Sequence, residues 1–285
     1  MIPEIKEIAK RSLPQPLWTM LRLARVWSSV HFYRERKVTH VYGGFPLSIW
    51  LTDPLAQGWY DSDWPELPEI GLLKKYGLKP GARVFDIGAH QCVVALMLAK
   101  TVGPEGFVVA VEANPENSVA GERNRELNAV GNCKVMHAAG AAQSGTLVFN
   151  RGQNGQVDDG AGEWGRMEVR AVSVDDLAAE HGQPDVLFID VEGFECELLR
   201  GAQKTLAGRP DCFVEVHVGA GLEKYGGSVN AVLGLFPSGY EYFIAPPEGA
   251  FVPLAQNSPV LRDRFFLVAL NGERAGSEMN GRQVM

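Results

Sequence analysis

From residue 82 onward, short apolar segments alternate with segments that have the spacing of helices. The segments 82–88, 107–112, 185–191 and 211–218 are rich in Val, Ile, Leu and Phe, as expected for strands buried on both faces. Strands that alternate with helices form a mostly parallel sheet covered by helices on both sides. We therefore predict an α/β fold for this part of the chain.

A Pro-rich stretch at residues 64–68 marks a change in this pattern. Before it, residues 38–64 alternate loosely between apolar and polar side chains around a Gly-Gly pair, which predicts a small hairpin. We therefore divide the chain into an N-terminal extension at 1–68 and a main domain at 69–285.

Within the main domain, residues 151–167 are mostly Gly and polar residues. Such a segment buries too little apolar surface to pack, so we expect a long loop that acts as a lid. It contains Trp164, which has no obvious core to fill. We predict that Trp164 contacts the substrate.

The front of the chain is basic. Residues 1–40 hold eight Lys or Arg and three Glu, a net charge of +5. Because the whole chain carries −7, the remaining residues carry −12. Apolar side chains recur there at helical spacing and predict an amphipathic helix; they are Leu17, Met20, Leu21, Ala24 and Trp27. Two interpretations stay open: the helix packs on the main domain or a partner subunit, as in a homodimer, or residues 1–37 lie on an anionic membrane surface.

Several classes of protein are disfavoured. A net charge of −7 argues against nucleic acid as a partner, because binding a duplex requires many Lys and Arg at once. No segment approaches the roughly 20 apolar residues of a transmembrane helix. The four cysteines form no CxxC pair and we find no signal-peptide pattern, so we expect reduced thiols in the cytoplasm, either free or at the inner face of the membrane.

The first candidate site follows the segment 82–88, where an apolar strand ends in Asp86 and Gly88. Glycine allows the backbone to approach a ligand closely, and the start of the next helix offers free N–H groups. We expect Asp86, Gly88, Ala89 and His90 to contact a cofactor.

The second candidate site ends the segment 107–112. Glu112 stands 24 residues after Gly88, a suitable position for accepting hydrogen bonds from ribose hydroxyls, and Ala113 and Asn114 follow it. We expect residues Ala139, Gly140 and Ala141 to flank an adenine. The loop has a single glycine in place of the GxGxxG pattern that holds a pyrophosphate, which disfavours an NAD-dependent oxidoreductase. S-adenosylmethionine has no pyrophosphate, and Asp86 can bind its ammonium group. The loop therefore favours S-adenosylmethionine as the cofactor.

The third candidate site lies at residues 189–195, where Asp190 and Glu192 follow an apolar strand. On the next strand, Glu215 and His217 share one face because side chains alternate with a period of two. We expect the catalytic base to be among His217, Asp190 and Glu192. We also expect Glu192 and His217 to contact the substrate, and Asp190 to contact the cofactor. A divalent metal held by this group together with Glu215 is chemically reasonable, but we do not expect one.

Several motifs together resemble the FkbM methyltransferases over about residues 80–218. They are DIGA at 86–89, VEANP at 111–115, LN at 127–128, VDDL at 174–177, IDVEGFE at 189–195, LLRGA at 198–202 and VEVH at 214–217. The resemblance implies a Rossmann-like class I methyltransferase fold, with a mostly parallel seven-stranded sheet and an antiparallel edge strand. It also implies methyl transfer from S-adenosylmethionine, with S-adenosylhomocysteine as product.

The sequence departs from the family pattern in the loop after DIGA. His90 and Cys92 stand where the family tends to have Asn and then Gly, and Ala113 replaces a usual Pro. The family implies a hydroxyl of a sugar or glycosylated secondary metabolite as the acceptor. A polyketide or peptide hydroxyl, or a catalytically weak Rossmann-like binding protein, remain alternatives; a base-modifying methyltransferase is disfavoured because the chain has no NPPY-like tetrapeptide.

Overall fold

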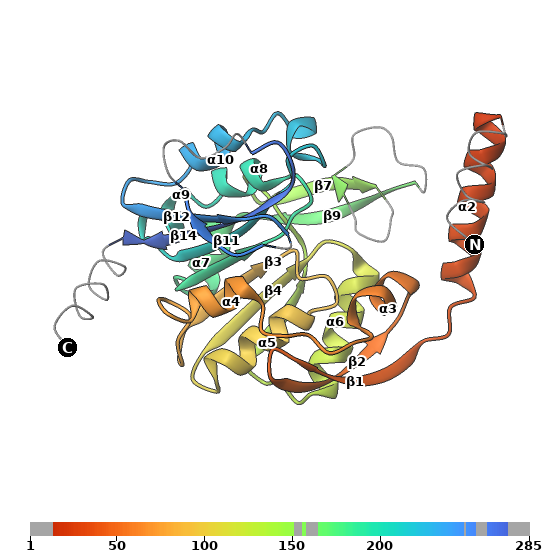
Figure 1. Cartoon of the computed structure of the whole chain (residues 1–285), viewed down its shortest axis with the longest axis horizontal. Coiled ribbons are helices and arrows are strands. Elements are labelled where there is room, and N and C mark those ends of the chain that lie inside the picture. The colour runs from red at the N-terminus through yellow and green to blue at the C-terminus, as the bar shows by residue number, and fades with distance from the viewer. Residues whose placement is uncertain (1–13, 151–155, 158–164, 248, 255–260, 273–285) are drawn as a thin grey trace.

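The computed structural model describes residues 14–150, 156–157, 165–247, 249–254 and 261–272. Its centre is an eight-stranded sheet in the order β13-β12-β14-β11-β10-β3-β4-β5 (Figure 1). Five neighbouring strands run parallel to one another. They are β3 (Arg83–Ile87), β4 (Phe107–Glu112), β5 (Cys133–His137), β10 (Val186–Ile189) and β11 (Asp211–Val216).

The predicted α/β sheet is confirmed, with two differences at one end. Strand β14 (Phe265–Asn271) runs antiparallel between β11 and β12 (Tyr240–Ala245), so the antiparallel strand lies inside the edge. Strand β14 is apolar and almost fully buried, which explains its position inside the sheet, because a strand at the edge would expose part of its side chains and backbone. The two-residue strand β13 (Val252–Pro253) pairs with β12 and adds an eighth strand.

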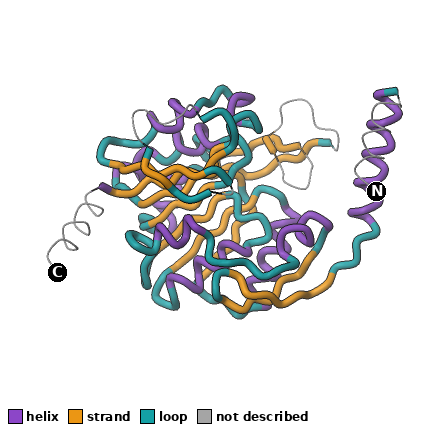
Figure 2. Tube along the Cα trace, in the orientation of Figure 1, coloured by secondary structure: helices purple, strands orange, loops and turns teal. Residues whose placement is uncertain are grey.

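Helices cover both faces of the sheet (Figures 1 and 2). On one side lie α5 (Val93–Val102) and α6 (Pro115–Leu127). The other side carries α7 (Val174–His181), α8 (Glu195–Arg200), α9 (Gln203–Ala207) and α10 (Val229–Gly234), which share one core with the sheet. The sequence pattern predicts a single helix over residues 194–207, whereas the structure has two, α8 and α9, and α7 was not predicted.

A second, smaller sheet stands beside the first. Its order is β6 (Ala139–Gly140), β9 (Arg166–Val172), β7 (Gly145–Asn150) and β8 (Gln156–Val157). Within the predicted lid at 151–167, the structure describes residues 156–157, which form β8, and residues 165–167, where β9 begins. Residues 151–155 and 158–164, with Trp164, lie outside the described residues.

The N-terminal region contains the predicted helix and hairpin. Helix α2 (Gln15–His31) projects from the body (Figure 1), and β1 (Arg36–Tyr42) pairs with β2 (Phe45–Leu51). Two short helices, α3 (Pro54–Tyr60) and α4 (Pro68–Leu73), lead into β3.

The hairpin belongs to the core of the main body. Leu47, Ile49 and Leu51 are fully buried in the same cluster as α5. The backbone N–H groups of Ser48 and Trp50 donate to the side-chain carbonyls of Asn128 and Asn124, at 2.9 and 2.8 Å. The N-terminal extension up to residue 68 is therefore not packed as a separate unit.

Candidate active site

The loop after β3 approaches the end of β10 very closely. Gly88 has φ = +93°, and a Cβ atom there would overlap the carbonyl oxygen of Asp190. The N–H groups of Gly88 and Ala89 both donate to the carbonyl of Val111, at 2.8 and 3.0 Å. Glycine thus allows the loops after three strands to meet at the carboxyl edge of the sheet, where ligands bind in open α/β sheets.

The two unusual residues of this loop adopt the left-handed conformation. His90 has φ = 48° and Cys92 has φ = 63°, values that favour glycine. The Cys92 side chain is fully buried against Gly121 of α6, where a Cβ atom would overlap the cysteine sulfur. The loop keeps a glycine-like path at Cys92 because a second glycine makes room for the thiol.

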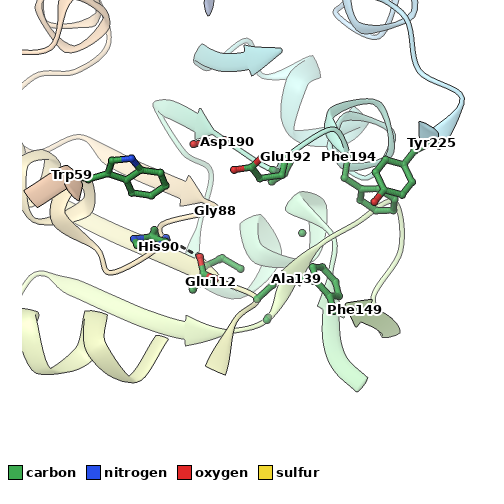
Figure 3. A pocket seen from close by; sticks show the side chains of 15 residues that line it. Trp59, Gly88, His90, Glu112, Ala139, Phe149, Asp190, Glu192, Phe194 and Tyr225 are labelled. Atoms are coloured by element: carbon green, nitrogen blue, oxygen red, sulfur yellow. Dashed lines mark hydrogen bonds between the residues drawn. The ribbon is translucent and has the colours of Figure 1, made fainter. Parts of the chain in front are cut away.

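His90 joins this loop to the N-terminal region. Its Nδ1 lies 2.8 Å from the hydroxyl of Tyr60, and its ring centroid lies 5.0 Å from that of Trp59. Burial lowers the pKa of His90 to about 4, so the imidazole is neutral. Figure 3 shows Trp59 and His90 together at one end of the cleft. Helix α3 therefore forms part of the site.

Glu112 ties two loops together at the end of β4. One carboxylate oxygen accepts the N–H of His90 and the other accepts the N–H of Asn114, both at 2.7 Å (Figure 3 draws the first). Burial raises the pKa of Glu112 to about 7. The side chain of Asn117 also bonds to this carboxylate, so about one of its four acceptor sites is left for a further donor. The side chain of Asn114 is used differently, because it caps α6 by accepting the N–H of Asn117.

These elements line a cleft that is partly open to solvent. Of the predicted cofactor residues, those that line it are Gly88, His90, Glu112, Ala113, Ala139, Gly140 and Asp190. The others, Asp86, Ala89, Asn114 and Ala141, are buried and absent from the lining.

Aromatic side chains that were not predicted also line the cleft. They are Trp59, Phe149, Phe194 and Tyr225. Figure 3 shows Phe149, Phe194 and Tyr225 at the end opposite Trp59. Phe194 lies inside the IDVEGFE motif and was the one most open to prediction, whereas the other three come from segments with no motif.

Asp190 and Glu192 reach the cleft from the turn after β10. Glu192 has φ = 51°, an unfavourable value for a residue with a side chain, which costs on the order of 1–3 kcal/mol. Gly193 has φ = +102° and packs against the backbone of Gly221, with no room for a Cβ. This tight turn aims the Glu192 carboxylate into the cleft (Figure 3).

His217 lies behind these carboxylates, at the end of β11, and does not line the cleft. Its side chain is 2% exposed, and its Nδ1 is 2.6 Å from the Oε1 of Glu195. Its Nε2 is 3.7 Å from Asp190, 3.6 Å from Glu192 and 3.6 Å from Glu215. Burial alone would lower the pKa of His217, but the Glu195 hydrogen bond and the surrounding carboxylates raise it to about 9.

Two further residues complete this group. Glu195, the first residue of α8, is fully buried and also accepts the N–H of Gly193 at 2.9 Å. Sequence reasoning missed it, although it ends the IDVEGFE motif. Glu215 is mostly buried and has a cationic partner in Arg264, whose Nη1 lies 3.1 Å from its Oε1.

The polar groups of the site fit S-adenosylmethionine. One carboxylate oxygen of Asp86 is buried without a hydrogen-bond partner among the described residues, as expected where an ammonium group binds. Glu112 keeps acceptor capacity for a ribose hydroxyl, and the small residues Ala139 and Gly140 leave space for a flat ring. The sheet order and this cleft define a class I S-adenosylmethionine-dependent methyltransferase with a Rossmann-like fold.

The family follows from the sequence comparison. The Methyltransferase FkbM domain matches residues 86–240, more than half of the chain, and the chain belongs to this family. A protein-L-isoaspartate O-methyltransferase of Triticum aestivum is 35% identical over 95 residues, which are 33% of this chain and only 35% of the wheat protein. The predictions of a methyltransferase, of its family and of S-adenosylmethionine as cofactor are confirmed.

Two solved structures are similar in fold, each with a TM-score of 0.44. Methyltransferase FkbM from Methylobacillus flagellatus KT is 14% identical, and the similarity covers 66% of this chain and 43% of that one. Aeropyrum pernix fibrillarin in complex with natively bound S-adenosyl-L-methionine is 15% identical, with 85% and 86% covered.

Proposed function

We propose that this methyltransferase methylates a hydroxyl group of a sugar or a glycosylated metabolite. The observation that carries the proposal is the pair of carboxylates, Asp190 and Glu192, that reaches the cleft between aromatic walls. Carboxylates accept hydroxyl protons, and aromatic faces pack well against sugar rings. A polyketide or peptide hydroxyl is the second candidate for the same site.

The roles of the chain's own residues follow from their positions. S-adenosylmethionine supplies a methyl group on a cationic sulfonium. Asp190 and Glu192 hold the acceptor hydroxyl and receive its proton, since they line the cleft and His217 does not. His217 is then a positioning residue, fixed by Glu195 and facing both carboxylates. Orientation of the hydroxyl supplies most of the rate in such a displacement.

Trp59 is the described aromatic residue that we assign to the acceptor side. It is 41% exposed and stands opposite Phe194 and Tyr225 across the cleft (Figure 3). Contact of Trp164 with the acceptor remains a prediction, because that residue lies outside the described part of the chain.

Calorimetric titration with S-adenosylmethionine and S-adenosylhomocysteine tests the cofactor roles. We expect micromolar binding that falls at least tenfold in Glu112→Ala and is unchanged in Glu116→Ala, a first-turn acid of α6 outside the cleft lining. NAD serves as the negative control. Transfer of a labelled methyl group to a panel of sugars and glycosides then tests the acceptor class; labelling of peptide or polyketide hydroxyls alone would contradict it.

We also propose that α2 attaches the protein to an anionic membrane surface. None of the described helices is long and apolar enough to cross a bilayer. Leu17, Met20, Leu21 and Trp27 are exposed on α2, and the first 40 residues carry a net charge of +5. Apolar side chains on a basic helix favour a position at the headgroup boundary.

A further inference from the structure

The group formed by Asp190, Glu192, Glu215 and His217 has the chemistry of a metal site. Three carboxylates converge on one imidazole nitrogen at 3.6–3.7 Å. Ligand atoms of Asp190, Glu192 and His217 all lie within 4.8 Å of one another. Around a six-coordinate ion with bonds of about 2.4 Å, opposite ligands are about 4.8 Å apart and neighbouring ligands about 3.4 Å. The observed distances are close to this range.

The positions of two atoms are consistent with a bound ion. The Nε2 of His217 faces three carboxylates and lies 3.6–3.7 Å from each, beyond hydrogen-bonding distance. The Oδ1 of Asp190 is buried, with no hydrogen-bond partner among the residues that the structure describes. Buried polar atoms normally have partners, because an unsatisfied one costs about 1–3 kcal/mol.

The other ring nitrogen of His217 is held as in many metal sites. Its Nδ1 is 2.6 Å from Glu195, which is fully buried and fixed in turn by the N–H of Gly193. A metal-binding histidine typically donates its second N–H to a carboxylate in this way, which orients the ring. The Glu195 contact therefore fixes the ring of His217 with its Nε2 facing the three carboxylates.

The charge of the group also favours a cation. Its ion pairs among the described residues include one permanently charged cationic side chain, Arg264, which is half exposed and contacts Glu215. Four carboxylates, counting Glu195, therefore face at most two cationic groups, Arg264 and a protonated His217, and an excess of negative charge remains. Oxygen-rich sites with a single imidazole suit divalent ions such as Ca²⁺ and Mn²⁺.

We infer that Asp190, Glu192 and His217, with Glu215 beside them, bind one divalent metal ion at the edge of the cleft. The role of the ion rests on the proposed function: it would hold the acceptor oxygen and make the hydroxyl more acidic, as a Lewis acid does, and a carboxylate oxygen of Glu192 that does not bind the ion would receive the proton. This inference replaces the sequence-based expectation that no metal binds.

Binding of Mn²⁺ to the chelator-treated full chain tests the inference directly, with free Mn²⁺ measured by electron paramagnetic resonance. The titration is done at pH 8 without oxygen, because a metal-bound imidazole must be neutral. We expect one ion per chain with Kd below about 100 μM. Glu192→Gln should weaken binding at least about tenfold. Glu197→Gln, which removes a carboxylate of α8 that faces Arg200, should not.

No Mn²⁺ binding by the wild type at about 1 mM, far above the Kd of a dedicated site, would overturn the inference. So would equal weakening in both variants, which would indicate diffuse attraction to negative charge. Circular dichroism of Glu192→Gln checks its fold, and Asp190→Asn provides a second variant. Titration of the same metal-free protein with S-adenosylhomocysteine separates the two claims: retained binding without Mn²⁺ binding refutes the metal alone, whereas loss of nucleoside binding refutes the proposed function.

Discussion

The thiol of Cys92 packs against Gly121, and a side chain added at Gly121 tests this contact. Gly121→Ala places a methyl group on the buried Cys92 sulfur, so we expect a loss of stability of about 1–3 kcal/mol from overpacking. Alanine itself favours a helix by about 1 kcal/mol over glycine, which offsets part of that loss. The melting temperature should fall by roughly 2–4 °C for each kcal/mol that remains.

The control is the same substitution in a Cys92→Gly background. Without the thiol, the methyl group added at position 121 meets no sulfur, and the gain in helix propensity should leave the melting temperature equal to or higher than that of Cys92→Gly alone. A drop of the same size in both backgrounds would show that the sulfur is not the obstacle.

The ionisation of Asp86 leads to a prediction of how cofactor binding depends on pH. Burial and the nearby Glu112 raise the pKa of Asp86 to about 7, so the carboxyl holds a proton below that pH. An ammonium group binds the carboxylate, and binding therefore releases the proton. Affinity for S-adenosylhomocysteine should rise between pH 5.5 and 7, by at most about tenfold per unit for each proton released.

Calorimetry in buffers of different ionisation enthalpy measures this proton release. Glu112, with a pKa of about 7 from burial, contributes a second proton, so Asp86→Asn should reduce the slope rather than abolish it. An unchanged slope in Asp86→Asn would exclude Asp86 as the ammonium ligand. In the free protein the linkage has the opposite sign: both raised pKa values stabilise the fold at low pH, and this stability is lost as pH rises toward 7.

The acids of the site could be predicted because each lies at the carboxyl end of an apolar strand. Asp86, Glu112 and Asp190 belong to neighbouring parallel strands, whose carboxyl ends share one edge of the sheet. The pairing of His217 with Glu195 could not be predicted, because it depends on the turn at Gly193 that brings α8 against the end of β11. Sequence patterns locate strand ends but not the path of such a turn.

At the scale of elements, predictions from residue propensity were wrong where tertiary contacts determine the local structure. The break between α8 and α9 falls at Gly201, where a Cβ atom would overlap the carbonyl of Ala141. The close approach of the loop after β6 thus ends a helix that the sequence pattern would continue. Strand β9 alternates over a seven-residue segment directly after a polar stretch and was not predicted, and its first two residues fall in the predicted loop at 151–167.

The hairpin β1–β2 leads to a prediction about where the folding unit begins. We expect deletion of residues 1–31 to leave the melting temperature within about 2 °C, because α2 projects from the body and contributes little burial. Deletion of residues 1–68 should prevent folding, since it exposes the core that Leu47, Ile49 and Leu51 cover. Thermal melting and binding of S-adenosylhomocysteine are the measurements. A folded, binding-competent chain without residues 1–68 would contradict this expectation and support a main domain that begins at residue 69.

For the whole molecule, we predict that the projecting helix α2 brings methylation to a membrane surface. We expect the full chain to sediment with vesicles that contain about 30% phosphatidylserine and not with neutral ones, and to be released by about 0.5 M NaCl, since salt screens surface attraction. Met20→Asp should abolish binding because Met20 is 59% exposed on α2. Val119→Asp is the matched control, an equally exposed apolar residue on α6, and should bind as the wild type does.

Sedimentation velocity on the same samples separates this prediction from self-association. If α2 mediates a dimer instead, the full chain will sediment as two copies and Met20→Asp as one, with no binding to either kind of vesicle. The membrane prediction would then be wrong, and the apolar face of α2 would belong to a subunit interface. Under the membrane prediction the chain stays monomeric in solution, and methyl transfer to a soluble acceptor is the same with and without residues 1–31, because α2 contributes no residue to the cleft lining.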